Sequence, residues 1–184
     1  MALVVLLRGV NVGGHRTFRP TVLAEQLRHL DTVSIGAAGT CVVWRPVTQA
    51  ELRDELKRRL PFDTEIMICQ GREIFRLIAQ DFFAGHPARP NIVRFVSVLA
   101  RRPRSAPRLP KSLPSGSRWT LKVLARDGRF VIGLYRRQMK AISYLGTLDQ
   151  VFGVSATTRN WNTISAIAKV LASGATCRIR RSRA

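Results

Sequence analysis

The stretch LLRGVNVGGHR, residues 6–16, follows a short apolar run and precedes Pro20 and a helical pattern. This order predicts a strand over residues 3–7, then a glycine-rich turn, then a helix over residues 20–30. Glycine allows positive φ angles and the close approach of another group to the backbone. A loop that leads into a helix also presents free N–H groups to an anion. The stretch is therefore both the start of the fold and a candidate binding site.

The next elements follow from the same kind of pattern. We expect strands over residues 32–35, 40–44 and 65–69, and a helix after residue 48 that buries three leucines at a spacing of four. Thr48 and Glu51 have the spacing of a capping box at the start of that helix. The resulting order, βαββαβ, is the ferredoxin-like split motif, in which residues 65–70 should pair with residues 3–8.

The second half of the chain repeats part of this pattern. A helix over residues 72–83 precedes a strand over residues 91–99, and Asp127-Gly128 joins two further strand patterns as a hairpin. A helix is expected over residues 138–145 and another near the C-terminus. We therefore predict an α+β fold with two ferredoxin-like halves in one compact unit: residues 2–90, residues 91–172, and a basic disordered tail at residues 173–184.

Two strings resemble a known family. LLRGVNVGG at residues 6–14 and TTRNWNT at residues 157–163 resemble the bacterial domain-of-unknown-function family numbered 1697, over about residues 2–172. The resemblance implies a duplicated α/β fold of ferredoxin-like halves and implies no reaction. Members usually carry Ser-Gly-Asn where this chain has Ala38-Gly39-Thr40. This difference leaves open whether a polar site shared by the family has been lost here.

The charge is large and unevenly distributed. The 184 residues carry a formal net charge of +20. Residues 101–184 hold 18 Lys and Arg against two Asp and Glu, whereas residues 1–100 hold 13 against nine. A genome that favours arginine codons explains why only five of the 31 basic residues are lysine, but not the excess of positive charge. A polyanion partner would offset the self-repulsion of such a chain.

Targeting and redox signals point to a cytoplasmic protein with no membrane partner. No apolar run approaches the roughly 20 residues of a membrane-spanning helix. The apolar run at residues 2–7 ends at Arg8 and lacks a basic start, which argues against a signal peptide. Cys41, Cys69 and Cys177 lack the spacing of a metal site or a disulfide framework. We predict no cofactor.

The excess cations gather around a proline-rich segment and the hairpin. Four prolines and interspersed cations predict an extended, exposed segment after residue 100. The predicted nucleic-acid-binding residues are Arg101, Arg102, Arg104, Arg108, Lys111, Arg118, Lys122, Arg126, Arg129, Arg136 and Arg137.

The glycine-rich stretch has two interpretations, a plain turn or an anion contact. It matches neither a Walker sequence nor a dinucleotide fingerprint. The string at residues 157–163 also has two interpretations. Its polar residues cap the last helix while Trp161 packs under the sheet, or they face a ligand beside the glycine-rich loop. The candidate anion- or ligand-binding residues are Arg8, Gly9, Asn11, Gly13, Gly14, His15, Arg16, Arg159, Asn160 and Asn162.

Catalytic signals are few. His15, His29 and His86 lie at no metal-ligand spacing. Beyond residue 100 only Asp127 and Asp149 are acidic, and a two-metal nuclease needs clustered carboxylates. We name no catalytic residue and no metal ligand, and we favour a protein that is not an enzyme.

The favoured function is a non-enzymatic module that binds nucleic acid by charge, RNA or single strands in particular. A ferredoxin-like sheet can present a face on which bases stack. Aromatic residues make up only 7% of the chain, and no strand matches the RNP pattern, so charge is better supported than base readout. The alternatives are an enzyme or sensor for a phosphorylated small molecule bound at the glycine-rich loop, and a protein-interaction module.

Overall fold

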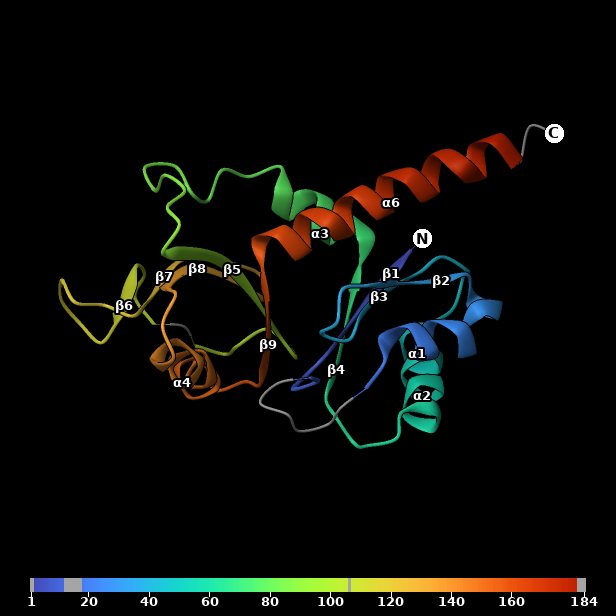
Figure 1. The fold of residues 1–184 in the computed structure, drawn as a ribbon, viewed down its shortest axis with the longest axis horizontal. Coiled ribbons are helices and arrows are strands. Elements are labelled where there is room, and N and C mark those ends of the chain that lie inside the picture. Colours follow the sequence, from blue (N-terminus) through green and yellow to red (C-terminus); the bar gives the residue numbers. More distant parts are fainter. Residues whose placement is uncertain (1, 12–17, 106, 182–184) are drawn as a thin grey trace. The chain divides into compact units, whose positions relative to one another are not determined.

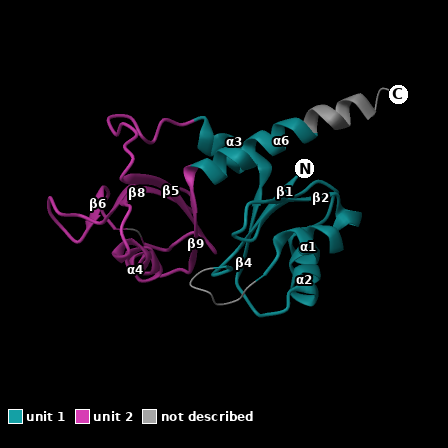
Figure 2. Ribbon diagram, viewed as in Figure 1, with its two compact units in different colours: residues 1–79, 162–184 teal, residues 80–161 magenta. Residues whose placement is uncertain are grey.

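The chain divides into two compact units (Figure 2). The computed structural model describes residues 2–11, 18–105 and 107–181, with side chains described as far as residue 174. Unit 1 comprises residues 1–79 and 162–184, and unit 2 comprises residues 80–161. The sequence prediction divided the chain after residue 90 and assigned the last helix to the second half. In the structure residues 162–184 belong to unit 1, because the last helix packs there.

Unit 1 contains a four-stranded antiparallel sheet (Figure 1). Its strands, in the spatial order β2-β3-β1-β4, are β1 (Leu3–Leu7), β2 (Thr32–Ile35), β3 (Thr40–Val43) and β4 (Ile66–Gln70). In the central strand Val5 lies opposite Cys41 on one side and Ile68 on the other. The predicted pairing of residues 3–8 with residues 65–70 is therefore confirmed.

Helices cover this sheet. They are α1 (Pro20–Gln26), the 3₁₀ turn η1 (Arg28–Leu30), α2 (Gln49–Arg59), α3 (Gly71–Ile78) and α6 (Trp161–Arg181). Buried leucines of α1 and α2 pack with Leu3, Val5 and Leu7 of β1. All five residues of β1 are buried, which explains why its sequence is apolar throughout and does not alternate. The predicted capping box is present at Thr48 and Glu51.

The last helix is longer than the sequence predicts. α6 runs to Arg181, through residues expected to form a disordered tail from residue 173. Leu171 packs against Gly71 at the start of α3, where an added Cβ would lie 3.0 Å from the leucine Cδ2. At Gly174 an added Cβ would lie 2.2 Å from the ring of Trp44. Gly174 thus allows close packing inside the helix and does not end it.

Unit 2 contains a second antiparallel sheet with five strands, in the order β6-β7-β8-β5-β9. The strands are β5 (Ile92–Leu99), β6 (Lys111–Leu113), β7 (Leu121–Asp127), β8 (Phe130–Arg136) and β9 (Ala156–Asn160). Its helices are α4 (Lys140–Gly146) and α5 (Leu148–Phe152). The hairpin turn is confirmed, with Gly128 at φ +60°. The sequence analysis did not predict β6 or β9.

The second half does not repeat the βαββαβ element order. Between β5 and β7, in residues 100–105 and 107–120, the structure contains β6 and no helix. Proline fixes φ and lacks a donor N–H, so four prolines in this segment disfavour a helix. The broader prediction of an α+β fold holds, because both units combine an antiparallel sheet with helices.

The two faces of the unit 2 sheet differ in character. One face carries Phe95, Leu99 and Val131, which pack with Leu148 and Phe152 of α5. The other face carries a row of three paired residues, Lys122, Leu134 and Arg94, from β7, β8 and β5. Side chains of a strand alternate between faces, so Ile92 and Arg136 share this second face. The fold therefore places cations from three strands together.

Candidate functional site

The predicted anion site begins where β1 ends, at Arg8. The Arg8 guanidinium forms an ion pair with the carboxylate of Glu65, and the Arg8 backbone N–H donates to the Glu65 carbonyl at 3.0 Å. The Thr64 hydroxyl donates to the Arg8 carbonyl at 2.6 Å. The charge of Arg8 is therefore offset by a neighbouring acid at the edge of β4.

The Asn11 side chain is held by hydrogen bonds inside the protein. Its side-chain Nδ2 donates to the carbonyls of Phe18 (2.8 Å) and Ala37 (2.6 Å), and its Oδ1 accepts from the Phe18 N–H (2.8 Å). Gly9 and Asn11 have φ angles of +64° and +55°, a region that glycine and asparagine adopt most readily. Both amide hydrogens of Asn11 are thus used inside the protein, as the plain-turn interpretation expects. The other predicted members, Gly13, Gly14, His15 and Arg16, lie outside the described residues.

The turn that departs from the family pattern lies against this loop. The Leu7 N–H donates to the Gly39 carbonyl at 2.8 Å, and the neighbouring Ala37 carbonyl accepts from Asn11. Gly39 has φ +67°, and an added Cβ there would lie 2.9 Å from the Leu7 Cβ. This turn therefore contacts Leu7 and Asn11. In this chain Ala38 stands where the resemblance implies a serine.

The second string is divided between a strand and a helix. Thr157 to Asn160 lie in β9 and Asn162 lies in α6. Arg159 is buried, and its Nη1 donates to the Thr157 hydroxyl (2.9 Å) and the Thr158 carbonyl (2.8 Å). Burial lowers the Arg159 pKa to about 10, so the side chain remains a cation at neutral pH. Asn160 is exposed, and as the next residue of the strand it points away from the Arg159 face.

The predicted nucleic-acid-binding cations all lie in unit 2. Seven are exposed: Arg101, Arg102, Arg104, Arg108, Arg118, Arg126 and Arg137. Lys111, Lys122, Arg129 and Arg136 are half-buried. Of this set, the structure places Lys122 and Arg136 around Trp119: Lys122 lines the same pocket as the indole, and the Arg136 guanidinium carbon lies 5.0 Å from the ring centroid.

The pocket beside Trp119 has a volume of about 220 Å³. Its lining includes His86, Arg89, Ile92, Trp119, Lys122 and Leu134. Below the loop, Arg94 donates to the His86 carbonyl at 2.7 Å and its guanidinium lies 4.7 Å from the Phe83 ring centroid. The pocket thus combines an apolar floor, an aromatic ring and a cationic rim.

Sequence reasoning omitted Arg89, Arg94, His86 and Trp119 from the candidate site. Arg94 interrupts an otherwise apolar strand pattern, which was an available signal. The position of Arg89 in a loop between two prolines offers no comparable signal.

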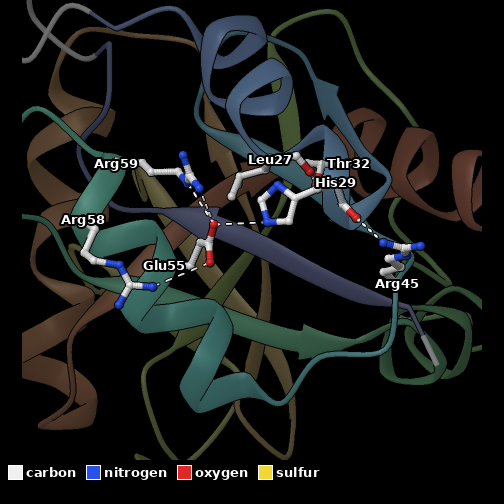
Figure 3. A network of polar contacts seen from close by, with 7 residues as sticks. All are labelled: Leu27, His29, Thr32, Arg45, Glu55, Arg58 and Arg59. Carbon is white, nitrogen blue, oxygen red and sulfur yellow. Dashed lines mark hydrogen bonds and ion pairs between the residues drawn. The ribbon is translucent and has the colours of Figure 1, made fainter.

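Polar contacts in unit 1 have a different character (Figure 3). The Glu55 carboxylate bonds Arg59 at 2.6 Å, Arg58 at 3.6 Å and His29 at 3.2 Å. The hydrogen bond from Arg59 is the main cause of the lowered Glu55 pKa. This helix face carries both acids and cations, which contact one another. Among the described residues, no three His, Cys, Asp or Glu side chains lie close enough together to hold a metal ion.

None of the helices in the part of the chain that the structure describes is long and apolar enough to cross a membrane.

Comparison with known proteins identifies a family. No curated protein matches the chain. The conserved bacterial protein SP0830 from Streptococcus pneumoniae has a similar structure, with a TM-score of 0.59 and 14% identity, over 92% of this chain and 98% of that one. At this identity the similarity is one of fold. Residues 1–109 match the family described as "Protein of unknown function (DUF1697)". The match covers more than half of the 184 residues, and the chain therefore belongs to the DUF1697 family.

Proposed function

We propose that this protein binds nucleic acid through unit 2, mainly by charge and without catalysing a reaction. The observation that carries the proposal is the charge of this unit: fifteen Lys and Arg against three Asp and Glu, a formal +12. Three carboxylates cannot neutralise fifteen cations, so most of this charge is available to a polyanion. Such binding would take place in the cytoplasm.

We also propose that the two units are related ferredoxin-like halves. The sheet of unit 1 has the order β2-β3-β1-β4, and four strands of unit 2 have the matching order β7-β8-β5-β9. In this interpretation unit 2 lacks the helix between its first two equivalent strands. Leu109 and Leu113 of the connecting segment pack on the α5 side of the sheet. The opposite face, with Lys122, Arg94 and Arg136, would be suited to contact with a ligand.

The test is the salt dependence of binding to a labelled oligothymidylate, measured by fluorescence anisotropy. Each phosphate neutralised releases condensed counterions, so affinity falls as salt rises. For six contacts we expect a log–log slope of about −4 on single strands. Replacing Arg101, Arg102, Arg104 and Arg108 with alanine should flatten that slope by up to about 3, since all four are exposed.

The matched control removes the same charge from unit 1. Arg19, Arg28, Arg58 and Arg72 are also exposed. Arg28 pairs with Glu25 of α1, and Arg58 pairs with Glu55 of its own helix α2. Their replacement with alanine should leave the slope nearly unchanged. An equal effect of the two variants would show that net charge matters and that its location does not. The rival function is binding of a phosphorylated small molecule at the glycine-rich loop. It predicts that Arg8→Ala loses binding of that molecule and that the unit 2 variant keeps it.

A further inference from the structure

The pocket beside Trp119 has an apolar and aromatic lining, which binding by charge alone does not require. A surface that bound only phosphates would need exposed cations and no aromatic lining. Here the Trp119 indole and the side chains of Ile92 and Leu134 line a concave site, and none of the lining residues is acidic. Lys122 and Arg89 line the same site.

We propose that this pocket holds one unpaired base of a single-stranded nucleic acid, with the adjoining phosphate on Lys122 and Arg89. The inference rests on the proposed function and names its ligand. A base is flat, has two π-faces and is attached to an anion, so it matches an aromatic wall beside two cations. Stacking accepts any base, which agrees with binding that has little sequence preference.

The surroundings of Trp119 hold the ring in place for this role. Arg136 stacks its guanidinium over the indole, and Gln138 Nε2 donates to the hydroxyl of the adjacent Thr120 at 2.8 Å. The Arg94 bond to the His86 carbonyl fixes the opposite wall. Two further cations, Arg94 and Arg136, therefore lie close to the pocket and favour an anionic ligand there.

A duplex cannot place a base in this pocket. Its bases are paired and stacked, so only its phosphates would reach the pocket. The structure therefore points to a preference for single strands over duplex that a purely charge-driven surface would lack.

The experiment compares oligothymidylate with an abasic deoxyribose-phosphate oligomer of equal length. Trp119→Ala should weaken binding of oligothymidylate by about 5- to 150-fold and leave the abasic oligomer unaffected. Trp119→Phe keeps an aromatic face and should retain most of the affinity. Lys122→Gln should weaken both oligomers alike and flatten the salt slope by about 0.7, the value of one phosphate contact.

A measurement on the wild-type protein avoids any effect of substitution on folding. The NMR signal of the Trp119 indole N–H should move on titration with oligothymidylate and stay in place with the abasic oligomer. Thymidine monophosphate should bind much more weakly than the oligomer, because it offers a single phosphate.

The outcomes separate the two proposals. If both oligomers bind equally well and Trp119→Ala changes neither, the base pocket is wrong and charge-driven binding stands. If the monophosphate binds as tightly as the oligomer, the ligand is a free nucleotide and the single-strand inference is wrong. If the wild-type protein binds neither oligomer at low salt, both proposals are wrong.

Discussion

The two units use matching strand orders to different effect. Unit 1 places α1 between its first two strands and buries every residue of β1, whereas unit 2 connects β5 and β7 through a proline-rich segment with exposed arginines. A sheet covered by helices contributes its residues to a core. In unit 2 Leu109 and Leu113 of that segment pack on the α5 side of the sheet. The opposite face carries Lys122, Arg94 and Arg136.

The charge balance follows the same division. Unit 1 has sixteen Lys and Arg against eight Asp and Glu, and Glu55 alone contacts three basic side chains (Figure 3). Unit 2 has fifteen against three. In unit 1 the cations help to hold helices in place. In unit 2 the cations outnumber the acids five to one, which is the physical basis for proposing a binding function there.

The largest expected effect comes from truncating a core side chain in unit 1. Leu52 of α2 is fully buried in the cluster that includes β1. Leu52→Ala should destabilise unit 1 by about 2–5 kcal/mol, because it removes buried methyl groups and leaves a cavity. Hydrogen exchange followed by mass spectrometry should show the loss in unit 1 peptides. Nucleic-acid affinity of the folded protein should not change; a large drop would contradict the division of roles.

A smaller effect is expected from adding one methyl group to unit 2. At Gly133 a Cβ would lie 2.3 Å from the Lys122 carbonyl and 2.7 Å from the Phe95 ring. Gly133→Ala should therefore cost about 1–3 kcal/mol through overpacking and separation of β7 from β8. Hydrogen exchange of the backbone amides should become faster in β7 and β8. Gly146→Ala is the control, because an added Cβ there meets nothing within 4 Å.

The capping box of α2 should make a contribution of about 1 kcal/mol. The Glu51 N–H donates to the Thr48 hydroxyl at 3.2 Å, and the Thr48 N–H donates to the Glu51 carboxylate at 2.9 Å. Thr48→Ala leaves the Glu51 N–H without this acceptor and should cost about 0.5–2 kcal/mol. Thr48→Ser keeps the hydroxyl and should be close to wild type in urea unfolding. Equal losses in both variants would argue against capping as the cause.

The smallest effect concerns pH. Arg59 holds the pKa of Glu55 below its ordinary value, so the folded state favours the ionised carboxylate. This stabilisation is present above the ordinary Glu55 pKa and disappears as the pH falls through the lowered value. The Glu55 side chain is half-buried at the surface, where ion pairs contribute little, so Glu55→Gln should cost less than about 1 kcal/mol at neutral pH. The difference from wild type should vanish in acid; a difference that grows in acid would reverse the assignment.

Local patterns predicted most elements of unit 1. A few neighbouring residues were enough to predict β1 from its apolar run and α2 from its leucine spacing and its Thr48–Glu51 pair. The βαββαβ order followed from such predictions. Strand β9 was missed because its sequence, ATTRN, has only two β-branched residues. Its stability as a strand comes from pairing with β5, more than 50 residues earlier.

The pocket beside Trp119 could not be predicted from the sequence for a similar reason. Its walls come from the loop at residues 85–89, from Ile92 of β5, from Trp119 just before β7, and from β7 and β8. Only the strand register brings them together. From charge alone, the sequence analysis selected unit 2 and most of its exposed arginines for the proposed binding. It could not single out Lys122 and Arg136 or add Arg89 and Arg94, because their common position depends on which sheet face each strand residue occupies.

The insertion of unit 2 within unit 1 also sets the order in which the chain can fold during synthesis. Residues 80–161 are contiguous and leave the ribosome before residues 162–184, which unit 1 needs for the contact between Leu171 and Gly71. Domains usually complete their folds from the N-terminus onward. Here the order is reversed: unit 2 is fully translated first, while the N-terminal unit still waits for its last helix.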